Sequence, residues 1–420
     1  MSLAQWLLLT TMVFAVGVLL FKPLDAPRSL LVGLLAYMAP GLNKTTSYVY
    51  GVADTDDRTV LIGAFVLLLT TIVGVIWPAS PPSTQRLLRA NLGGKEFSHF
   101  LAGCSILFLL FIMARHGPLF FAVVREETPL GGYEQVVYRT LASLTLMVGI
   151  VERSRSAIGI ACLMLAIYTI MGDRTAVAMG AVAWFVHISY AKGLTGWQIV
   201  RQNWIVVLLG VAFVVQGKQL YVAANAFVRG EAQVALNVAA ARAGVPEPVL
   251  VFQTLNQTVK HNWSLEFQTL EGALPGLIPF STTLGFRSDQ FNLYMQNELF
   301  ASVRPYSLAY NPWAEGWAIG GWVGIFVVWA ILIVGLICIH GLAMRRSGIL
   351  HALACTMIAY VGFYSQRNTI RTEIAFVSQL CLAVGVLFLA FKAWKWLTET
   401  FFPQARFFET DPELPESQSE

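Results

Sequence analysis

Four arginines lie at the ends of apolar runs or in a long polar stretch between them, and guanidinium groups at such positions can bind an anion. Arg174 follows Gly and Asp in a tight turn between two apolar runs, where a charge near hydrocarbon costs about 2.5–3.5 kcal/mol on insertion scales. Arg367 and Arg371 are four residues apart, so a helix presents both guanidinium groups on one face. Arg287 lies near aromatic residues in a long polar stretch. Such a group suits a diphosphate, because guanidinium groups bind charged oxygens bidentately and stabilise a departing anion. Alternatively, each arginine extends to lipid headgroups or pairs with a nearby acid.

Two residue types offer proton transfer beside such an anion. Glu315 precedes an apolar run, and a carboxylate partly withdrawn from water is a stronger base, so it is the first candidate for general base. His261, in a Lys-His-Asn-Trp stretch, is the second candidate. The alternatives are that Glu315 stabilises the N-terminus of a helix through the helix dipole and that His261 is a surface residue. Sugar rings stack on aromatic faces, and the candidate sugar-binding residues, which otherwise pack the loop onto the protein, are Tyr310, Asn311 and Trp313.

The amino-acid composition restricts the class of protein that carries these residues. The chain of 420 residues is 56% apolar and 12% charged, with a mean hydropathy of +0.63, whereas a soluble globular protein carries roughly 25% charge. This excludes a cytosolic enzyme, a nucleic-acid-binding domain and a disordered chain. All five cysteines lie in apolar runs, which predicts small apolar side chains rather than disulfides or metal ligands. No cofactor or metal is expected.

The sequence predicts an all-α polytopic membrane protein. About eleven apolar runs reach the roughly 17–25 residues that a spanning helix needs. They lie at 3–21, 28–46, 59–77, 98–114, 135–151, 156–172, 175–191, 202–217, 318–340, 349–365 and 374–391.

The distribution of charge predicts the orientation and the domains. Lys22 and Arg28 follow the first run, which begins without a positive charge, so the N-terminus is predicted outside and the C-terminus in the cytoplasm. Four regions follow: a transmembrane bundle over 1–217, a folded extracytoplasmic loop over 218–317, transmembrane spans over 318–392, and a disordered cytoplasmic tail over 393–420. Helices are expected within the loop at 219–244 and 288–302.

An acidic Asp-Thr-Asp-Asp run over 54–57 has two interpretations. Its spacing resembles the acidic motifs of some glycosyltransferases. Arg58 follows it at a predicted helix start, and helix capping explains the run better.

The stretch Tyr-Asn-Pro-Trp-Ala-Glu-Gly-Trp-Ala-Ile-Gly-Gly-Trp-Val-Gly over 310–324 resembles the loop-to-helix signature of the O-antigen polymerase and ligase superfamily. In that signature an Asn and a Glu precede a Gly-rich helix start. Arg174 in its turn, the late outer loop and the Arg367/Arg371 pair are similar to that family's layout. The ligase branch usually has His where this chain has Tyr310, which favours a polymerase. The family's Arg-x10-Gly spacing is absent, so no arginine role is carried over.

The resemblance implies a metal-independent glycosyltransferase with a GT-C-like fold in the bacterial inner membrane. Its donor and acceptor would be undecaprenyl-diphosphate-linked oligosaccharides at the periplasmic face, with a chain-length regulator as a further partner and no nucleic acid. The alternatives are an O-antigen ligase, which transfers polymer to lipid A-core, and a flippase for lipid-linked oligosaccharides. A flippase is disfavoured because no internal repeat is found.

Overall fold

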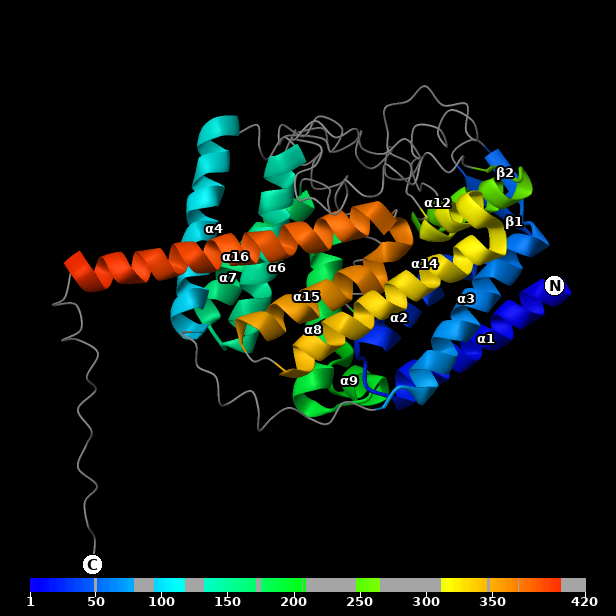
Figure 1. The fold of residues 1–420 in the computed structure, drawn as a ribbon, viewed down its shortest axis with the longest axis horizontal. Coiled ribbons are helices and arrows are strands. Elements are labelled where there is room, and N and C mark those ends of the chain that lie inside the picture. The colour runs from blue at the N-terminus through cyan, green and yellow to red at the C-terminus, as the bar shows by residue number, and fades with distance from the viewer. Residues whose placement is uncertain are drawn as a thin grey trace, which may run out of the picture.

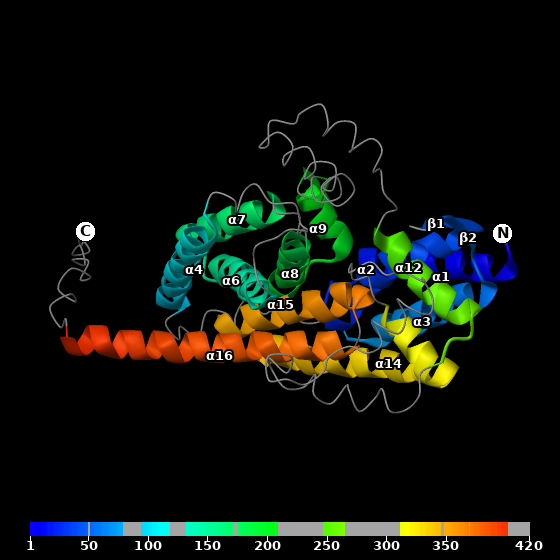
Figure 2. The ribbon, with the colours of Figure 1, turned by 90° about the horizontal axis from the view of Figure 1, so that it is seen from above.

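The computed structural model is a bundle of helices with one small β-hairpin (Figures 1 and 2). It describes residues 1–48, 51–78, 94–117, 132–170, 175–205, 207–208, 247–264, 311–345, 348–368 and 370–401. Its helices, in chain order, are α1 (Leu3–Phe21), α2 (Ala26–Met38), η1 (Ala39–Leu42), α3 (Asp57–Ile76), α4 (Gly94–His116), α6 (Gly132–Val151), α7 (Arg155–Ile170), α8 (Thr175–Lys192), α9 (Gly196–Gln202), α12 (Glu247–Lys260), α14 (Pro312–Arg345), α15 (Ile349–Phe363), η5 (Tyr364–Arg367) and α16 (Ile370–Phe401).

Six described helices are long and apolar enough to cross a membrane: α1, α3, α4, α14, α15 extended by η5, and α16. The chain is therefore an all-α protein with the character of a multi-pass membrane protein, while the predicted count of about eleven spans is not confirmed. The predicted run at 202–217 lies mostly outside the described residues, as do the helices expected at 219–244 and 288–302.

The second predicted span ends earlier than expected. Helix α2 stops at Met38, and the 3₁₀ turn η1 contains Pro40, which lacks a backbone N–H. The chain then forms an antiparallel hairpin of β1 (Thr45–Tyr48) and β2 (Gly51–Asp54), with Thr45 opposite Asp54. The prediction of a helix over 28–46 is wrong after residue 42 for this reason.

Helices α2 and α15 form the centre of the bundle. Nearly every residue of α15 is buried, and it packs against α2, α6, α8 and α14. The Ser29 hydroxyl of α2 donates to the Ile358 carbonyl of α15 at 3.4 Å. Because these two helices are enclosed by others, they fix the positions of the elements at both of their ends.

Arg28 is fully buried, so its role differs from the one that topology suggested. Its guanidinium donates to Gly74 O at 2.9 Å and to Trp77 O at 2.5 Å, at the end of α3, and it pairs with the Asp25 carboxylate. Burial raises the pKa of Asp25 to about 6 although the charge of Arg28 opposes this shift. Arg28 therefore joins α2 to the last carbonyls of α3, which attract cations. Because this contact explains the charge at position 28, Arg28 is weak evidence that the segment lies on the cytoplasmic side.

Helix α16 crosses the bundle and extends past it (Figures 1 and 2). It continues to Phe401, so residues 393–401 of the predicted disordered tail are helical. Lys395 of α16 donates to a carboxylate oxygen of Glu96 in α4 at 2.7 Å, and Phe391 lies edge-on to Phe97. These contacts explain why the helix continues beyond the predicted boundary.

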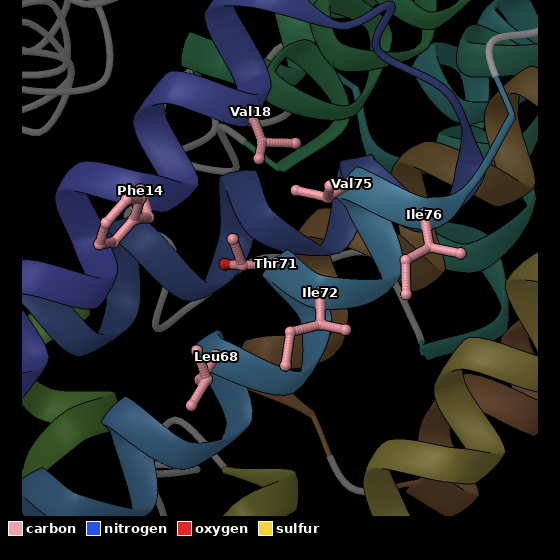
Figure 3. A pocket seen from close by; sticks show the side chains of 7 residues that line it. All are labelled: Phe14, Val18, Leu68, Thr71, Ile72, Val75 and Ile76. Atoms are coloured by element: carbon pink, nitrogen blue, oxygen red, sulfur yellow. The ribbon is translucent and has the colours of Figure 1, made fainter.

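An apolar hollow lies between α1 and α3 (Figure 3). Phe14 and Val18 of α1 line one side, and the other residues come from α3, namely Leu68, Thr71, Ile72, Val75 and Ile76. Most of these side chains are exposed apolar groups, as expected where a helix pair faces lipid. The hollow offers no polar chemistry, since the Thr71 hydroxyl already donates to Leu67 O.

Candidate functional site

The Gly-rich stretch that ends the long loop folds back on itself. Within α14 the backbone leaves the helical conformation at Gly320 (φ −157°) and Gly321 (φ 56°), and only glycine adopts a positive φ of this kind without strain. A Cβ on Gly324 would lie 1.9 Å from the carbonyl oxygen of Gly316. A short arm over 312–319 therefore packs against the long part of α14 over 322–345, and the membrane helix predicted to start at 318 is two helices joined by a break.

Asn311 fixes the start of this arm. Its Oδ1 accepts hydrogen bonds from the backbone N–H groups of Trp313 (2.9 Å) and Ala314 (3.2 Å), which is the geometry of an N-cap. Its Nδ2 donates to Val251 O of α12 at 3.1 Å. Asn311 is fully buried, so its observed role is to join the arm to α12.

Trp313 and Glu315 connect the arm to the segment that carries the paired arginines. The Trp313 indole is fully buried, and its Nε1 donates to Oε1 of Gln366 in η5 at 2.8 Å. Oε2 of Glu315, which is half-buried, accepts a hydrogen bond from the backbone N–H of Ile370 at 2.9 Å. Residues 313–315 and 366–370 are therefore adjacent. Contact of Asn311 and Trp313 with sugar stays a prediction.

Arg367 ends η5, directly beside these contacts. Its guanidinium carbon lies 5.6 Å from the centre of the Tyr364 ring, in a cation–π contact. The backbone of Arg371 belongs to the first turn of α16, one residue after Ile370, whose N–H binds Glu315. The Arg371 side chain lies outside the described atoms. The predicted base and one predicted diphosphate ligand are thus brought to the same end of the bundle.

Two ionisable groups lie next to this region and were not selected as site residues from the sequence: one is buried and the other is partly buried. Glu373 of α16 is 3% exposed, and its Oε1 accepts from Asn368 Nδ2 at 2.6 Å. Arg139 of α6 donates from Nη1 to the Tyr360 hydroxyl at 3.1 Å. This bond directs the Arg139 side chain toward α15. The available signal was its position inside an apolar run, since ionisable residues within spans usually serve function.

His261 is separate from these residues. It is exposed and follows the C-terminus of α12, whereas Val251, which binds Asn311, lies ten residues earlier and so about 15 Å away along the helix. The neighbouring Asn262 accepts from Arg58 at 2.9 Å. The structure therefore does not bring His261 together with Glu315 and Arg367, and its role as a base stays a prediction.

The acidic run over 54–57 caps a helix. Asp56 Oδ1 accepts from the backbone N–H of Arg58 at 2.8 Å at the start of α3. Burial alone would raise the pKa of Asp56, but hydrogen bonds and the charge of Arg58 outweigh burial and lower it. Asn256 of α12 accepts from the Asp56 N–H at 2.9 Å and donates to Asp54 O at 2.9 Å. The capping interpretation is confirmed, and the run also anchors α12.

Three other predicted site residues lie outside the described residues: Arg174, Arg287 and Tyr310. Comparisons of the chain with protein-family models, with curated proteins and with solved structures found no match. The candidate site is therefore defined by its own contacts: a carboxylate, a guanidinium and a buried Trp–Gln pair where α12, α14, η5 and α16 meet.

A cluster of possible metal ligands lies at the other end of α15. His187 of α8 and His351 and Cys355 of α15 place one ligand atom each within 4.8 Å of one another. From the sequence, Cys355 was expected to be a small apolar side chain, and no metal site was expected. The cluster was missed because His187 is 164 residues from His351, and the only local signal was the four-residue spacing of His351 and Cys355, which places both on one helix face.

Proposed function

We propose that this chain is a glycosyltransferase of the bacterial inner membrane that polymerises undecaprenyl-diphosphate-linked oligosaccharides at the periplasmic face. The observation that carries the proposal is the hydrogen bond from Ile370 N–H to Glu315 Oε2, together with the bond between Trp313 and Gln366. These contacts join two of the three segments on which the family resemblance rests, 305–324 and 366–373; the third is 172–176. The six apolar helices are long enough to cross a bilayer, and a lipid-linked substrate resides in a bilayer.

In this proposal the arginines hold the diphosphate of the growing chain. Arg367 and Arg371 lie near the carboxylate along the backbone, and Arg174 and Arg287 are further candidates from the sequence. As the bond between the anomeric carbon and the diphosphate oxygen breaks, negative charge develops on that oxygen, and guanidinium groups stabilise it. This role needs no metal ion.

Glu315 acts on the acceptor. The hydroxyl of the non-reducing-end sugar of a second lipid-linked unit attacks the anomeric carbon through an oxocarbenium-like transition state. Glu315 takes the proton of that hydroxyl as the new glycosidic bond forms. The Ile370 N–H holds one carboxylate oxygen and so fixes the orientation of the other, which is the positioning that general-base catalysis requires.

The test is incubation of the purified chain with synthetic lipid-diphosphate repeat units, with products resolved by length. The wild type is expected to produce a ladder, and Arg367→Ala and Arg174→Ala are expected to slow it by about 10- to 100-fold, the value of one charged hydrogen bond of about 1.5–3 kcal/mol. Arg367→Lys is expected to restore part of the rate because it keeps the charge. Arg201→Ala, at an exposed position on α9, is the control. Unchanged ladders in both alanine variants would contradict the site.

Deletion of the gene separates polymerase from ligase. A polymerase mutant carries single repeat units on lipid A-core, whereas a ligase mutant accumulates lipid-linked polymer. Accumulation of lipid-linked polymer would contradict the polymerase assignment and leave the glycosyltransferase class in place.

A further inference from the structure

Three side chains near the start of α15 point at one another. His187 Nδ1 lies 3.0 Å from His351 Nε2, and Cys355 Sγ lies 3.4 Å from the same nitrogen. His351 and Cys355 are fully buried, and His187 is partly buried. Among the described His, Cys, Asp and Glu residues, only these three gather closely enough to hold an ion.

The hydrogen bonds of His351 determine which of its nitrogens is available. Its Nδ1 lies 3.2 Å from the backbone carbonyl of Ala343 in α14. A carbonyl only accepts, so Nδ1 carries the proton and Nε2 presents a lone pair. Histidine ligands of metals are oriented in this way, by a second hydrogen bond from the other ring nitrogen to a carbonyl or carboxylate.

Without an ion, two donors compete for one acceptor in this cluster. A neutral imidazole nitrogen has one lone pair in the ring plane, and both His187 N–H and the Cys355 thiol approach Nε2 of His351. Only one of these two donors is accommodated with good geometry. A cation between the three atoms accepts a lone pair from each nitrogen and from the sulfur, so it satisfies all three at once.

The spacing suits a tetrahedral ion. With Zn–N of about 2.0–2.1 Å and Zn–S of about 2.3 Å, tetrahedral Zn²⁺ separates two nitrogen ligands by about 3.4 Å and nitrogen from sulfur by about 3.6 Å. The distances of 3.0 and 3.4 Å lie a few tenths of an ångström below these values. A small rotation of the side chains therefore accommodates the ion.

We propose that His187, His351 and Cys355 bind Zn²⁺. Two imidazoles and one thiolate form a ligand set that zinc uses with a fourth position for water. The Cys355 thiol loses its proton to solvent on binding, because the thiolate is the ligand, and both histidines bind as neutral imidazoles.

The ion joins α8 to α15, and α15 continues to the candidate functional site. Helix α15 runs from His351 toward η5 and Arg367, and α8 runs back from His187 to Thr175, the residue after Arg174. His187 and His351 each lie about 18 Å from the far ends of their helices. The ion therefore fixes α8 against α15 and is remote from Glu315.

The test uses the full chain, purified in detergent with a tag that contains no histidine or cysteine. The protein is incubated with Zn²⁺, freed of unbound metal and analysed for metal by mass spectrometry. The wild type is expected to retain about one Zn²⁺ per chain. Cys355→Ala and His187→Gln are expected to weaken zinc binding at least about tenfold, while Cys381→Ala, which removes an exposed cysteine, is expected to retain the ion.

Cobalt substitution provides a second measurement. Co²⁺ in place of zinc is expected to show a thiolate-to-metal charge-transfer band in the wild type that is absent in Cys355→Ala. His187 is the least buried of the three ligands, so His187→Gln keeps the test valid if Cys355→Ala fails to fold, as judged by size-exclusion chromatography. Absence of zinc from the wild type, equal zinc in the folded variants, or retention of Cu⁺ but not Zn²⁺ would overturn the proposal.

Discussion

Glu315 has two roles in the proposal, and two substitutions separate them. Glu315→Gln keeps an oxygen that accepts the Ile370 N–H but removes the basic carboxylate. Glu315→Ala removes both. The hydrogen bond of 2.9 Å joins α14 to α16, so its loss is expected to affect stability, whereas the loss of the base is expected to affect only the rate.

The magnitudes follow from the type of hydrogen bond. A hydrogen bond to a charged group contributes about 1.5–3 kcal/mol and a neutral one about 0.5–1.5 kcal/mol, so Glu315→Gln is expected to destabilise the chain by about 1 kcal/mol. Glu315→Ala leaves a partly buried N–H without its acceptor and is expected to cost about 1–3 kcal/mol. Removal of a general base slows proton transfer by about 10²–10⁴-fold, and this loss is expected in both variants.

The assay measures both quantities on the same preparation. Initial rates of coupling are measured with fluorescent lipid-diphosphate repeat units in proteoliposomes, and stability is measured by thermal unfolding in detergent. Glu399→Gln, at an exposed position near the end of α16, is the control. A wild-type rate in Glu315→Gln would refute the role of Glu315 as base, and equal unfolding of the Gln and Ala variants would refute the structural role of its bond to Ile370.

Three further predictions concern stability in detergent. Arg28→Met is expected to destabilise the chain by about 3–5 kcal/mol in denaturant titration, because Asp25 is left as an unpaired buried charge. The double variant Asp25→Asn/Arg28→Met is expected to regain part of the lost stability. An equal loss of stability in Lys22→Met would contradict the explanation. Burial raises the pKa of Asp25 from 3.8 to about 6, so between these pH values the folded state binds more protons than the unfolded state. The free energy of unfolding is therefore expected to fall by up to about 3 kcal/mol as pH rises from 4 through 6. If Asp25→Asn shows the same pH dependence of thermal unfolding as the wild type, Asp25 is not its source. Trp313→Phe is expected to cost about 1–3 kcal/mol in thermal unfolding because the buried Gln366 oxygen loses its donor, and the exposed Trp197→Phe serves as control.

The apolar runs predicted the helices well because length and hydropathy are local properties. The first helix was expected over 3–21 and is observed as Leu3–Phe21. The hairpin after η1 was missed, although the run Thr-Thr-Ser-Tyr over 45–48 is rich in β-branched and aromatic residues and typical of a strand. The hydropathy of the surrounding window outweighed that short signal.

The contacts of the candidate site were beyond sequence reasoning. Trp313 and Gln366 are separated by 53 residues, and nothing local predicts their pairing. The sequence identified Glu315 and Arg367 by residue type and position but gave no sign that the Ile370 N–H holds the carboxylate. Arg28 shows the converse error, since a rule that counts positive charges takes no account of whether a charge is buried.

The break at Gly320 and Gly321 separates the short arm of α14 from its long part, so these two residues can act as a hinge. The arm is held at three places: Asn311 binds α12, Trp313 and Glu315 bind the segment over 366–370, and Gly316 packs against Gly324 of the long part. A displacement of the start of α16 is therefore expected to move the arm through the Ile370–Glu315 hydrogen bond, because the break lets the arm move without bending the long part of α14. In the proposed function, Glu315 and the first residues of α16 would then move together, because the Ile370 N–H joins them.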